Sequence, residues 1–356
     1  MVAKQSVSVS LITLGDPNTL TGGYRYHRRM AELAPRNGAR LRFASFPERR
    51  FPLAARDADE VWRTVREQAP DVVVLDSIAA GFLATSRTWP EVPVAAVLHQ
   101  PPGGIDHGPL RTRVQAALDR SVYRRVSRLM VASEHLAEEL ARQGFPDTVV
   151  VPPGRDVAGF PDPVVVPPTD VRGDNRAALL CVANWLPRKG ILELLDAVAL
   201  LPEGAARLHL VGDEHADAAY RTAILRRLNR DELAGRVVRH GRLPGDEVAR
   251  LYRDCDVFVL PSTREPYGTV YGEAMAAGLP VVGWRAGNLP HLARHDREGR
   301  YAEVGDVPAL AAELCALIDD AGLRARLGAA ARERALTFPT WEDSARTFFA
   351  TLREIS

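Results

Sequence analysis

Lysine is almost missing from this chain of 356 residues. Of its 46 basic residues only Lys4 and Lys189 are lysines, and the rest are arginines. Cysteine is scarce as well, and the three cysteines lie far apart with no Cys-x-x-Cys pair. This spacing argues against a disulfide framework or a zinc site and favours a reducing compartment. Lys189 is the one internal lysine, and it stands next to Arg188.

Long apolar runs and a charge excess of one sign are absent too. No run approaches the roughly 18 apolar residues of a membrane span, and Met1–Gln5 leads straight into a strand pattern with no signal peptide. The net charge is +1, so no overall field favours a nucleic-acid partner. We therefore expect a cytoplasmic protein with neither a membrane span nor a nucleic-acid partner.

The order of strand and helix patterns predicts two α/β domains, and the length suits two domains of about 150 to 180 residues each. In the first half, strand patterns at 6–14, 40–45, 71–75, 93–98, 128–132 and 147–152 alternate with helix patterns at 24–34, 58–68, 108–126 and 134–143. In the second half, strand patterns lie at 177–183, 207–212, 236–240, 256–260, 280–283 and 301–304, and helices at 306–319, 321–336 and 340–354 close the chain. Strands that alternate with helices predict a doubly wound parallel sheet in each half.

A stretch rich in proline and glycine separates the two halves. We expect an N-terminal Rossmann-like domain over 1–160, a linker over 161–175 and a C-terminal Rossmann-like domain over 176–339. The last helix, 340–356, is expected to complete the N-terminal domain.

Two glutamates eight positions apart, Glu265 and Glu273, stand in the most informative run of the chain, Pro261–Gly278. An apolar strand ends at Pro261, and a glycine-containing loop and a short helix follow. In an open α/β sheet the carboxyl ends of strands bind ligands, and a helix N-terminus attracts anions. Carboxylates there can accept hydrogen bonds from hydroxyls, so the run favours a nucleotide sugar. The alternative is that Glu265 is a solvated loop residue and Glu273 a helix acid stabilised by the dipole.

The same run resembles the Glu-x7-Glu signature of the retaining GT-B glycosyltransferases of family 4. The resemblance implies two Rossmann-like domains that face each other across a cleft. It implies that Glu265 lies near the donor sugar and that Glu273 binds the ribose. The loop and helix start between them would add the donor contacts Tyr267, Gly268, Thr269 and Val270.

Arg188 and Lys189 also lie between a strand pattern and an amphipathic helix. Arginine can grip phosphate oxygens with its fork, and lysine acts as a compact point charge. The block resembles the Arg-Lys-Gly diphosphate clamp of the family, which implies that role here; the alternative is a basic pair on a loop. Gly22 and Gly23 resemble the family's glycine-rich first loop, whose backbone approaches the donor closely. A plain turn is the alternative for these glycines.

His99 follows the fourth strand pattern of the first domain. Such a histidine often only satisfies a neighbouring backbone group, but family members commonly have a histidine here that faces the donor sugar across the cleft. By the same resemblance, Asp213, Arg242 and Leu243 stand at strand ends that flank the nucleotide base. The contacts of Arg242 and Leu243 would be mostly through the backbone.

The resemblance, together with these residues, implies a retaining, metal-independent hexosyltransferase that uses a nucleotide-diphosphate sugar, with UDP or GDP as the nucleotide, and needs no cofactor. His99, Glu265, Arg188 and Lys189 would act at the reacting sugar and its leaving group. Two alternatives stay open: a sugar-nucleotide-binding partner subunit without catalysis, and a GT-B phosphorylase with pyridoxal phosphate on a lysine. The acceptor is not identified by the sequence.

Several features depart from this interpretation or compete with it. Asp254 and Asp256 spell Asp-x-Asp but precede their strand, so we expect no metal site there. His291 and His295 have helical spacing but lack the glutamate of His-Glu-x-x-His, which favours a surface helix. Asn288–His291 stands where many family members have Gly-x-Pro-Glu.

Tyr267 and Thr269 also differ from the residues usual in the family, which are Phe and an aliphatic residue.

The stretch Arg111–Arg128 is basic and amphipathic, a pattern that can lie on an anionic membrane. A peripheral contact with the inner face of the membrane stays open for it, and a solvated helix face packed on its sheet is the preferred interpretation.

Overall fold

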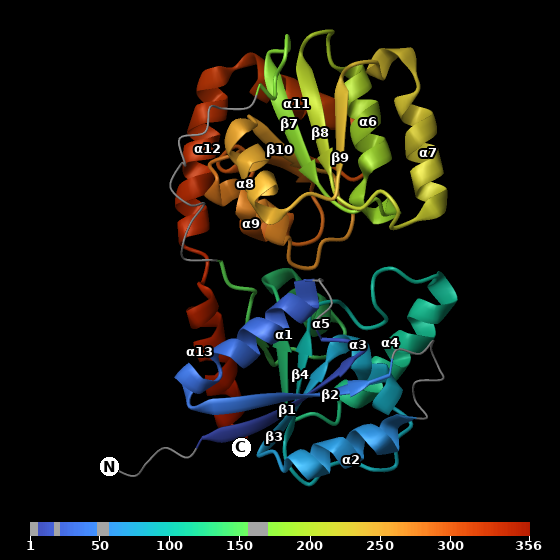
Figure 1. The fold of residues 1–356 in the computed structure, drawn as a ribbon, viewed down its shortest axis with the longest axis vertical. Coiled ribbons are helices and arrows are strands. Elements are labelled where there is room, and N and C mark those ends of the chain that lie inside the picture. Colours follow the sequence, from blue (N-terminus) through green and yellow to red (C-terminus); the bar gives the residue numbers. More distant parts are fainter. Residues whose placement is uncertain (1–5, 18–21, 48–56, 156–169) are drawn as a thin grey trace. The chain divides into compact units, whose positions relative to one another are not determined.

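The computed structural model describes residues 6–17, 22–47, 57–155 and 170–356. The chain divides into two compact units (Figure 1). Unit 1 consists of Met1–Gly154 with Pro339–Ser356, and unit 2 of Arg155–Phe338. Most of the expected linker lies outside the described residues.

Unit 1 is built on a sheet of six parallel strands in the order β2-β1-β3-β4-β5-β6. The strands are β1 (Val7–Leu14), β2 (Ala39–Phe46), β3 (Val72–Asp76), β4 (Val94–Leu98), β5 (Arg128–Val131) and β6 (Thr148–Val150). The chain runs from β1 to one side and then returns to the other side at β3. The direction of winding therefore reverses between β1 and β3, which makes this the switch point of the sheet.

The helices of unit 1 cover both faces of this sheet. They are α1 (Gly22–Leu33), α2 (Ala58–Gln68), α3 (Ser77–Ala80), α4 (Pro109–Tyr123), α5 (Glu134–Arg142) and α13 (Trp341–Arg353). On one face Leu11 packs with Tyr26 of α1 and Phe348 of α13. The next residue along β1, Ile12, packs on the other face with Trp62 of α2. Successive strand residues point to opposite faces, so both faces bury an apolar core.

Unit 2 repeats the plan with the strand order β12-β11-β10-β7-β8-β9, again all parallel. The strands are β7 (Ala177–Val182), β8 (Ala206–Val211), β9 (Val237–Gly241), β10 (Val257–Leu260), β11 (Val281–Trp284) and β12 (Gly299–Ala302). Here the winding reverses between β7 and β10. The expected doubly wound parallel sheets are confirmed in both units.

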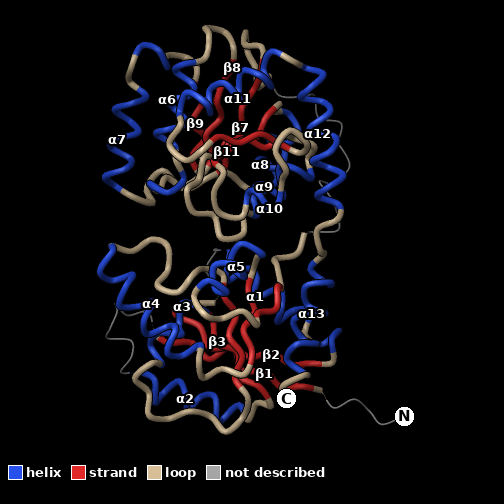
Figure 2. The backbone as a smooth tube through the Cα atoms, turned by 180° about the vertical axis from the view of Figure 1, so that it is seen from behind, coloured by secondary structure: helices blue, strands red, loops and turns tan. Residues whose placement is uncertain are grey.

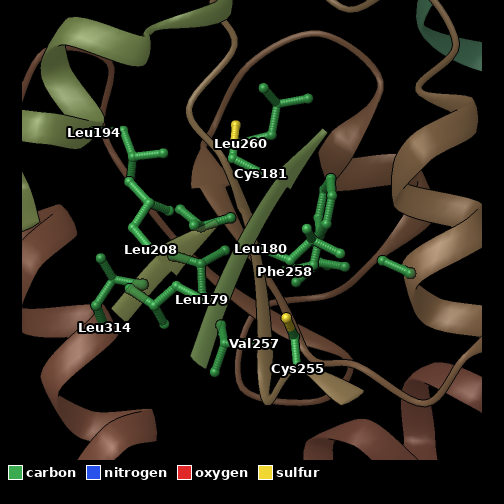
Figure 3. Close-up of a cluster of buried hydrophobic side chains, with 14 of the residues drawn as sticks. Leu179, Leu180, Cys181, Leu194, Leu208, Cys255, Val257, Phe258, Leu260 and Leu314 are labelled. Atoms are coloured by element: carbon green, nitrogen blue, oxygen red, sulfur yellow. The ribbon is translucent and has the colours of Figure 1, made fainter. Parts of the chain in front are cut away.

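The helices of unit 2 enclose an apolar core (Figures 2 and 3). They are α6 (Ile191–Leu200), α7 (Ala218–Leu228), α8 (Gly245–Asp254), α9 (Thr269–Ala276), α10 (Leu289–Leu292), α11 (Val307–Asp319) and α12 (Ala321–Leu336). Leu179 of β7 and Val257 of β10 lie in this core with Leu194 of α6 and Leu314 of α11. The strands read as continuous apolar runs because helices cover both faces of a parallel sheet.

The strand and helix boundaries differ from the expected ones by a few residues. The last strand begins at Gly299, two residues before the expected start, because Gly299 pairs with Val281 of β11. A side chain at Gly299 would come within 2.2 Å of the Val281 carbonyl oxygen, so the glycine marks a close strand contact. Helix α4 ends at Tyr123, where the chain turns into β5. Among the described residues, no helix has the length and apolarity that a lipid bilayer requires.

Gly328 tests how tightly α12 packs on the end of α9. A Cβ at this position would lie 2.2 Å from the carbonyl oxygen of Gly278. Helix propensity alone predicts that Gly328→Ala stabilises α12 by about 1 kcal/mol. We expect instead a loss of about 1–3 kcal/mol, because a backbone oxygen cannot move aside as a side chain can.

Urea unfolding of Gly328→Ala and of the control Gly245→Ala measures this difference. Among the described residues, no atom beyond α8 and the adjoining residue lies within 4 Å of a Cβ on Gly245, at the start of α8, so the control should stay within about 0.5 kcal/mol of the wild type. Equal stabilities of the two variants would contradict the close packing of α9 and α12.

Candidate functional site

The clearest cluster of charged residues lies at the switch point of unit 2. The 3₁₀ turn Pro187–Lys189 follows β7, and the segment from Pro261 to Glu265 follows the neighbouring strand β10. The two segments meet at Gly190, which has φ of 68°. A Cβ there would lie 2.1 Å from the carbonyl oxygen of Pro261. Only glycine combines this φ with so close an approach.

Hydrogen bonds join the two segments beyond that contact. The backbone N–H of Thr263 donates to the Arg188 carbonyl oxygen at 2.8 Å, and the buried Ser262 hydroxyl donates to the same oxygen at 3.0 Å. In return the Arg188 guanidinium donates to the Arg264 carbonyl oxygen at 3.2 Å. These bonds hold the Arg188–Lys189 turn in register with the residues that lead to Glu265.

Glu265 is paired with both predicted clamp cations. Its Oε2 forms an ion pair with Lys189 Nζ and lies 3.9 Å from Arg188 NH1. The three side chains are only 12–17% exposed. The structure therefore brings together Arg188, Lys189 and Glu265, and the group carries an excess of one positive charge.

The loop that carries Glu265 is supported from behind by Gly287 and Asn288. The Asn288 N–H donates to the Glu265 carbonyl oxygen at 2.9 Å, and its side-chain amide donates to the Tyr267 carbonyl oxygen at 2.8 Å. A Cβ at Gly287 would come within 2.8 Å of the Glu265 backbone. Asn288, which differs from the residue usual in the family, thus has a structural role: its side chain holds the loop through the hydrogen bond to Tyr267.

Helix α9 begins directly after this loop. Gly268 precedes it with φ of 89°, and a Cβ there would lie 2.7 Å from Tyr271. Thr269 and Val270 are its first two residues, so their N–H groups stand at the positive end of the helix. Glu273 lies one turn further, where its Oε2 accepts a hydrogen bond from Tyr252 at 3.2 Å.

The residues expected beside the nucleotide base form a second group. Arg242 NH2 donates to Asp213 Oδ2 at 2.7 Å. The His215 N–H and then the Arg242 guanidinium hold the pKa of Asp213 below its usual value. Asn184, at the end of β7, accepts from the Asp213 N–H at 3.0 Å, and Leu243 is partly buried against the core. Asp213 and Arg242 thus come together as expected of neighbouring strand ends.

His99, Gly22 and Gly23 belong to unit 1. The His99 N–H donates to the Ser77 hydroxyl at 3.4 Å, and its ring lies 4.6 Å from the Tyr26 ring. Gly22 and Gly23 open α1. A Cβ on Gly23 would be in ordinary contact with His99 at 3.6 Å, and none of the described atoms lies within 4 Å of a Cβ on Gly22. The packing of the described residues would therefore accept a side chain at either position: Gly22 faces open space, and Gly23 lies beside His99.

A buried polar cluster behind His99 was not anticipated from the sequence. Asp76, at the end of β3, accepts from the Thr13 hydroxyl at 2.7 Å and lies 3.0 Å from His27 Nε2. Burial would raise the pKa of Asp76, but the neighbouring His27 and His99 and the Thr13 hydrogen bond lower it to about 2. Burial and then the nearby His27 lower the pKa of His99 to about 3. His99 is therefore neutral at pH 7.

The two motifs that resemble metal-binding patterns, Asp254–Asp256 and His291–His295, lie in unit 2 outside the charged cluster at its switch point. Asp256 precedes β10, at the opposite edge of the sheet from Glu265, and its carboxylate pairs with Arg172 at 2.8 Å. Helix α10 ends at Leu292, so His291 and His295 do not share the expected surface helix. His295 instead accepts from the Tyr301 N–H at 3.2 Å, because the chain turns there into β12.

Sequence patterns could have indicated some of the supporting residues. Asp76 and Asn184 are polar residues at the ends of apolar strands, the same signal that singled out His99. Tyr252 and Thr13 could not have been found in this way, because their partners are distant in the sequence.

The low pKa of His99 predicts a specific pH dependence of stability. An unfolded chain protonates this histidine near pH 6.5, whereas the folded chain does so near pH 3. Between these values the unfolded state binds more protons, so stability falls as the pH is lowered. For one group the slope is at most about 1.4 kcal/mol per pH unit.

Urea unfolding at pH 7.5, 6.5, 5.5 and 4.5 for the wild type and His99→Gln measures the slope. The variant should lose less stability than the wild type below pH 6.5. Asp76 changes the slope little over this range, because the stability that its lowered pKa contributes is lost mainly below its unfolded pKa of 3.8. Parallel curves would show that the folded state does not hold His99 neutral.

Two family models match the chain, one for each unit. Residues 176–320 match glycosyl transferases group 1, and residues 2–154 match the glycosyl transferase 4-like domain. Together they cover both sheets.

Named relatives of the chain are also transferases or synthases that act on sugars. Glycogen synthase from Mycobacterium tuberculosis is 30% identical over 300 residues, which cover 78% of this chain and 67% of that protein. Sulfoquinovosyl transferase SQD2 from Arabidopsis thaliana is 44% identical over 96 residues, 26% of this chain and 19% of that protein. N-acetyl-alpha-D-glucosaminyl L-malate synthase from Bacillus anthracis is 32% identical, with 45% of this chain and 41% of that protein covered. The chain spans less than half of the length of these last two relatives.

Solved structures resemble the whole chain. Sucrose-phosphate synthase from Thermosynechococcus elongatus has a TM-score of 0.82 at 21% identity and covers 98% of each chain. HepE from Anabaena, solved with UDP and glucose, has a TM-score of 0.78 at 20% identity and covers 97% of this chain and 99% of its own. These likenesses show the fold, which is the expected GT-B fold. The two family models and the glycogen synthase match show that this chain belongs to the glycosyl transferases group 1 family.

Proposed function

We propose that this protein is a retaining glycosyltransferase that transfers a hexose from a nucleotide-diphosphate sugar to an acceptor hydroxyl, without a metal or other cofactor. The observation that carries the proposal is the pairing of Arg188 and Lys189 with Glu265 at the switch point of unit 2. Two cations and a carboxylate at the carboxyl ends of β7 and β10 suit a ligand that combines phosphates with hydroxyls.

In this proposal the donor diphosphate binds to Arg188, Lys189 and the N–H groups of Gly268 and Thr269 at the start of α9. Each well-made charge-assisted hydrogen bond contributes about 1.5–3 kcal/mol. HepE from Anabaena was solved with UDP and with UDP-glucose, which supports a nucleotide-sugar donor. We propose UDP or GDP as the nucleotide.

The ion pair between Lys189 and Glu265 supports a shared role for these residues. A lysine ammonium has three donors, so Lys189 can hold Glu265 and still meet a phosphate oxygen. Glu265 would thereby stay fixed beside the leaving group, where its carboxylate accepts hydrogen bonds from hexose hydroxyls. The excess positive charge of the group stabilises the phosphate charge that develops as the bond to the sugar breaks.

The proposed reaction is a front-face transfer. The acceptor oxygen forms a bond to the anomeric carbon of the hexose while the bond from that carbon to the diphosphate oxygen breaks. The electron pair of the broken bond stays on the diphosphate, and the acceptor proton passes to the departing phosphate oxygen. Retention follows because the new bond forms on the face from which the diphosphate leaves.

The remaining predicted residues have supporting roles in the proposal. Glu273 binds the ribose, and Asp213, Arg242 and Leu243 border the base. Tyr267 and Val270 flank the donor beside the loop. In unit 1 His99 helps to orient the hexose as a neutral imidazole, Gly22 and Gly23 make backbone contacts, and the acceptor binds to the same unit.

Two alternatives make different predictions. A phosphorylase would carry pyridoxal phosphate on a lysine and absorb in the near ultraviolet. Lys189 is paired with Glu265, and Lys4 lies outside the described residues. A non-catalytic partner subunit would bind the donor and leave it intact, so slow hydrolysis of the bound donor by the purified protein excludes it.

Calorimetric titration with UDP, GDP, ADP and dTDP in the presence of EDTA tests the donor site. One nucleotide should bind, and the variant Arg188→Ala/Lys189→Ala should weaken it by about 100-fold or more, since at least two charge-assisted contacts are lost. Turnover of the sugar donor should fall in parallel.

The matched control Arg326→Ala/Arg332→Ala removes two exposed charges from α12 and should bind like the wild type. Full turnover in the clamp variant would overturn the proposed role of Arg188 and Lys189. If the wild type binds none of the four nucleotides, the donor site itself is wrong.

A peripheral membrane contact through α4 is the second part of the proposal. Gln115, Ala116 and Asp119 face the interior of unit 1, as expected of a helix packed on its sheet. On the outer side Leu110 is 78% and Val114 46% exposed, one turn apart. The flanking arginines on the same helix suit anionic lipid headgroups. This contact would place the protein at the inner face of the membrane, and the free, buried Cys181 and Cys255 fit the reducing cytoplasm.

Co-sedimentation with vesicles of phosphatidylglycerol and phosphatidylcholine tests the contact. We expect binding at low salt that weakens at about 0.5 M NaCl and is several-fold weaker for Leu110→Ser/Val114→Ser, because apolar burial and charge attraction both contribute. The same changes should leave nucleotide binding unaltered. Absence of binding to anionic vesicles at low salt would show that the outer face of α4 is only solvated.

A further inference from the structure

A tyrosine that the proposed reaction does not use lies beside Glu273. Tyr252 belongs to α8 and is 2% exposed. Its hydroxyl lies 3.2 Å from Glu273 Oε2 and 3.4 Å from the carbonyl oxygen of Val270. Both acceptors belong to α9, so this hydroxyl joins α8 to the helix that follows the Glu265 loop.

The direction of this hydrogen bond is determined by charge. A carboxylate only accepts hydrogen bonds, and a neutral phenol donates one. Burial, and then the nearby Glu273, raises the pKa of Tyr252 well above its usual value, so the hydroxyl keeps its proton at neutral pH. Tyr252 therefore donates to Glu273.

The ring of Tyr252 is fixed by its surroundings. It packs against Phe258 of β10 at a centroid distance of 5.9 Å, and Phe258 packs edge-on against Tyr271 at 5.7 Å. The Tyr271 hydroxyl in turn donates to the Leu260 carbonyl oxygen at 2.5 Å. Two buried tyrosines thus anchor the start of α9, but only Tyr252 donates to a carboxylate.

We infer that Tyr252 is a positioning residue for ribose recognition: its hydroxyl orients the carboxylate of Glu273 toward the ribose hydroxyls of the donor. This inference rests on the proposed function, in which Glu273 binds the ribose. An ionised carboxylate offers about four acceptor sites, so one hydrogen bond from Tyr252 can fix its plane and leave further sites for hydroxyls. A carboxylate without this bond would sample other rotamers and bind the ribose less well.

The inference predicts an effect confined to ligands that have ribose hydroxyls. For the wild type, UDP should bind at least about tenfold more tightly than 2′,3′-dideoxy-UDP in a calorimetric titration, since each lost hydrogen bond to a charged group is worth a factor of this order. Tyr252→Phe should weaken UDP binding about tenfold and change 2′,3′-dideoxy-UDP binding less than about twofold. If the wild type prefers GDP, the corresponding pair of guanine nucleotides is used.

Tyr271→Phe is the matched control. It removes a buried tyrosine hydroxyl from the same region, but one that donates to a backbone carbonyl. We expect it to lower stability and to leave the ratio of the two affinities unchanged. A merely structural role of Tyr252 would give the same result as this control.

A double-mutant cycle with Glu273→Ala separates direct from indirect effects. Glu273→Ala should remove most of the preference for UDP over 2′,3′-dideoxy-UDP, and adding Tyr252→Phe should then cost little more. Equal losses from Tyr252→Phe in both backgrounds would overturn the inference.

The failure of this inference is distinct from the failure of the proposed function. If the wild type binds UDP and prefers it to the dideoxy nucleotide, but Tyr252→Phe keeps the same ratio, Tyr252 does not orient Glu273 and the donor site stands. If the wild type binds UDP with no preference for the ribose hydroxyls, the proposed role of Glu273 is wrong and so is this inference. If the wild type binds no nucleoside diphosphate, the proposed function itself is wrong.

Discussion

The close approach of the loops after β7 and β10 is the constraint on which the candidate site depends. Gly190 meets the Pro261 carbonyl oxygen where no other residue would fit, and the Arg188 carbonyl oxygen accepts from Thr263 and Ser262. Neighbouring strands that wind in opposite directions leave a crevice at their carboxyl ends. In this chain the two loops that follow β7 and β10 are bonded to each other. A side chain on one loop therefore has a defined position relative to a side chain on the other.

That constraint explains the state of the charged residues. Lys189 and Glu265 are mostly buried, and a buried charge is costly unless it is paired. The pairing keeps both side chains in place without a ligand, so a diphosphate would meet donors that are already oriented. Preorganised charges act more strongly on a developing negative charge than charges that must first rearrange. Lys189 is the one internal lysine, and arginines occupy the other internal basic positions; one of them, the half-exposed Arg285, pairs with Glu303.

The sequence was sufficient to predict the architecture and the main charged cluster. Apolar runs that alternate with helix patterns predicted both sheets, because helices cover both faces of a parallel sheet. Arg188, Lys189 and Glu265 were predicted because each follows an apolar strand and because their motifs resemble those of the family. The partners of these residues were not predicted: Asn288 reaches back to Tyr267, and such contacts between distant segments depend on the packing. Thr13 and His27 meet Asp76 for the same reason. The last strand was expected over 301–304 but begins at Gly299, because the missing side chain of this glycine permits a close contact with Val281.

The two units differ in the partners of their carboxylates and in how deeply these carboxylates are buried. In unit 2 the carboxylates of Glu265 and Glu273 are bound to donors on neighbouring loops and helices, and they border the edge of the sheet. In unit 1 the carboxylate of Asp76 is enclosed, with His27 and Thr13 as partners. Burial and then the neighbouring His27 lower the pKa of His99, which keeps this histidine neutral at pH 7. A neutral imidazole can both donate and accept a hydrogen bond, which suits recognition of uncharged hydroxyls, whereas the cations of unit 2 suit phosphate. The two units therefore present different groups, and this difference is consistent with the proposed binding of phosphate in unit 2 and of hydroxyls in unit 1.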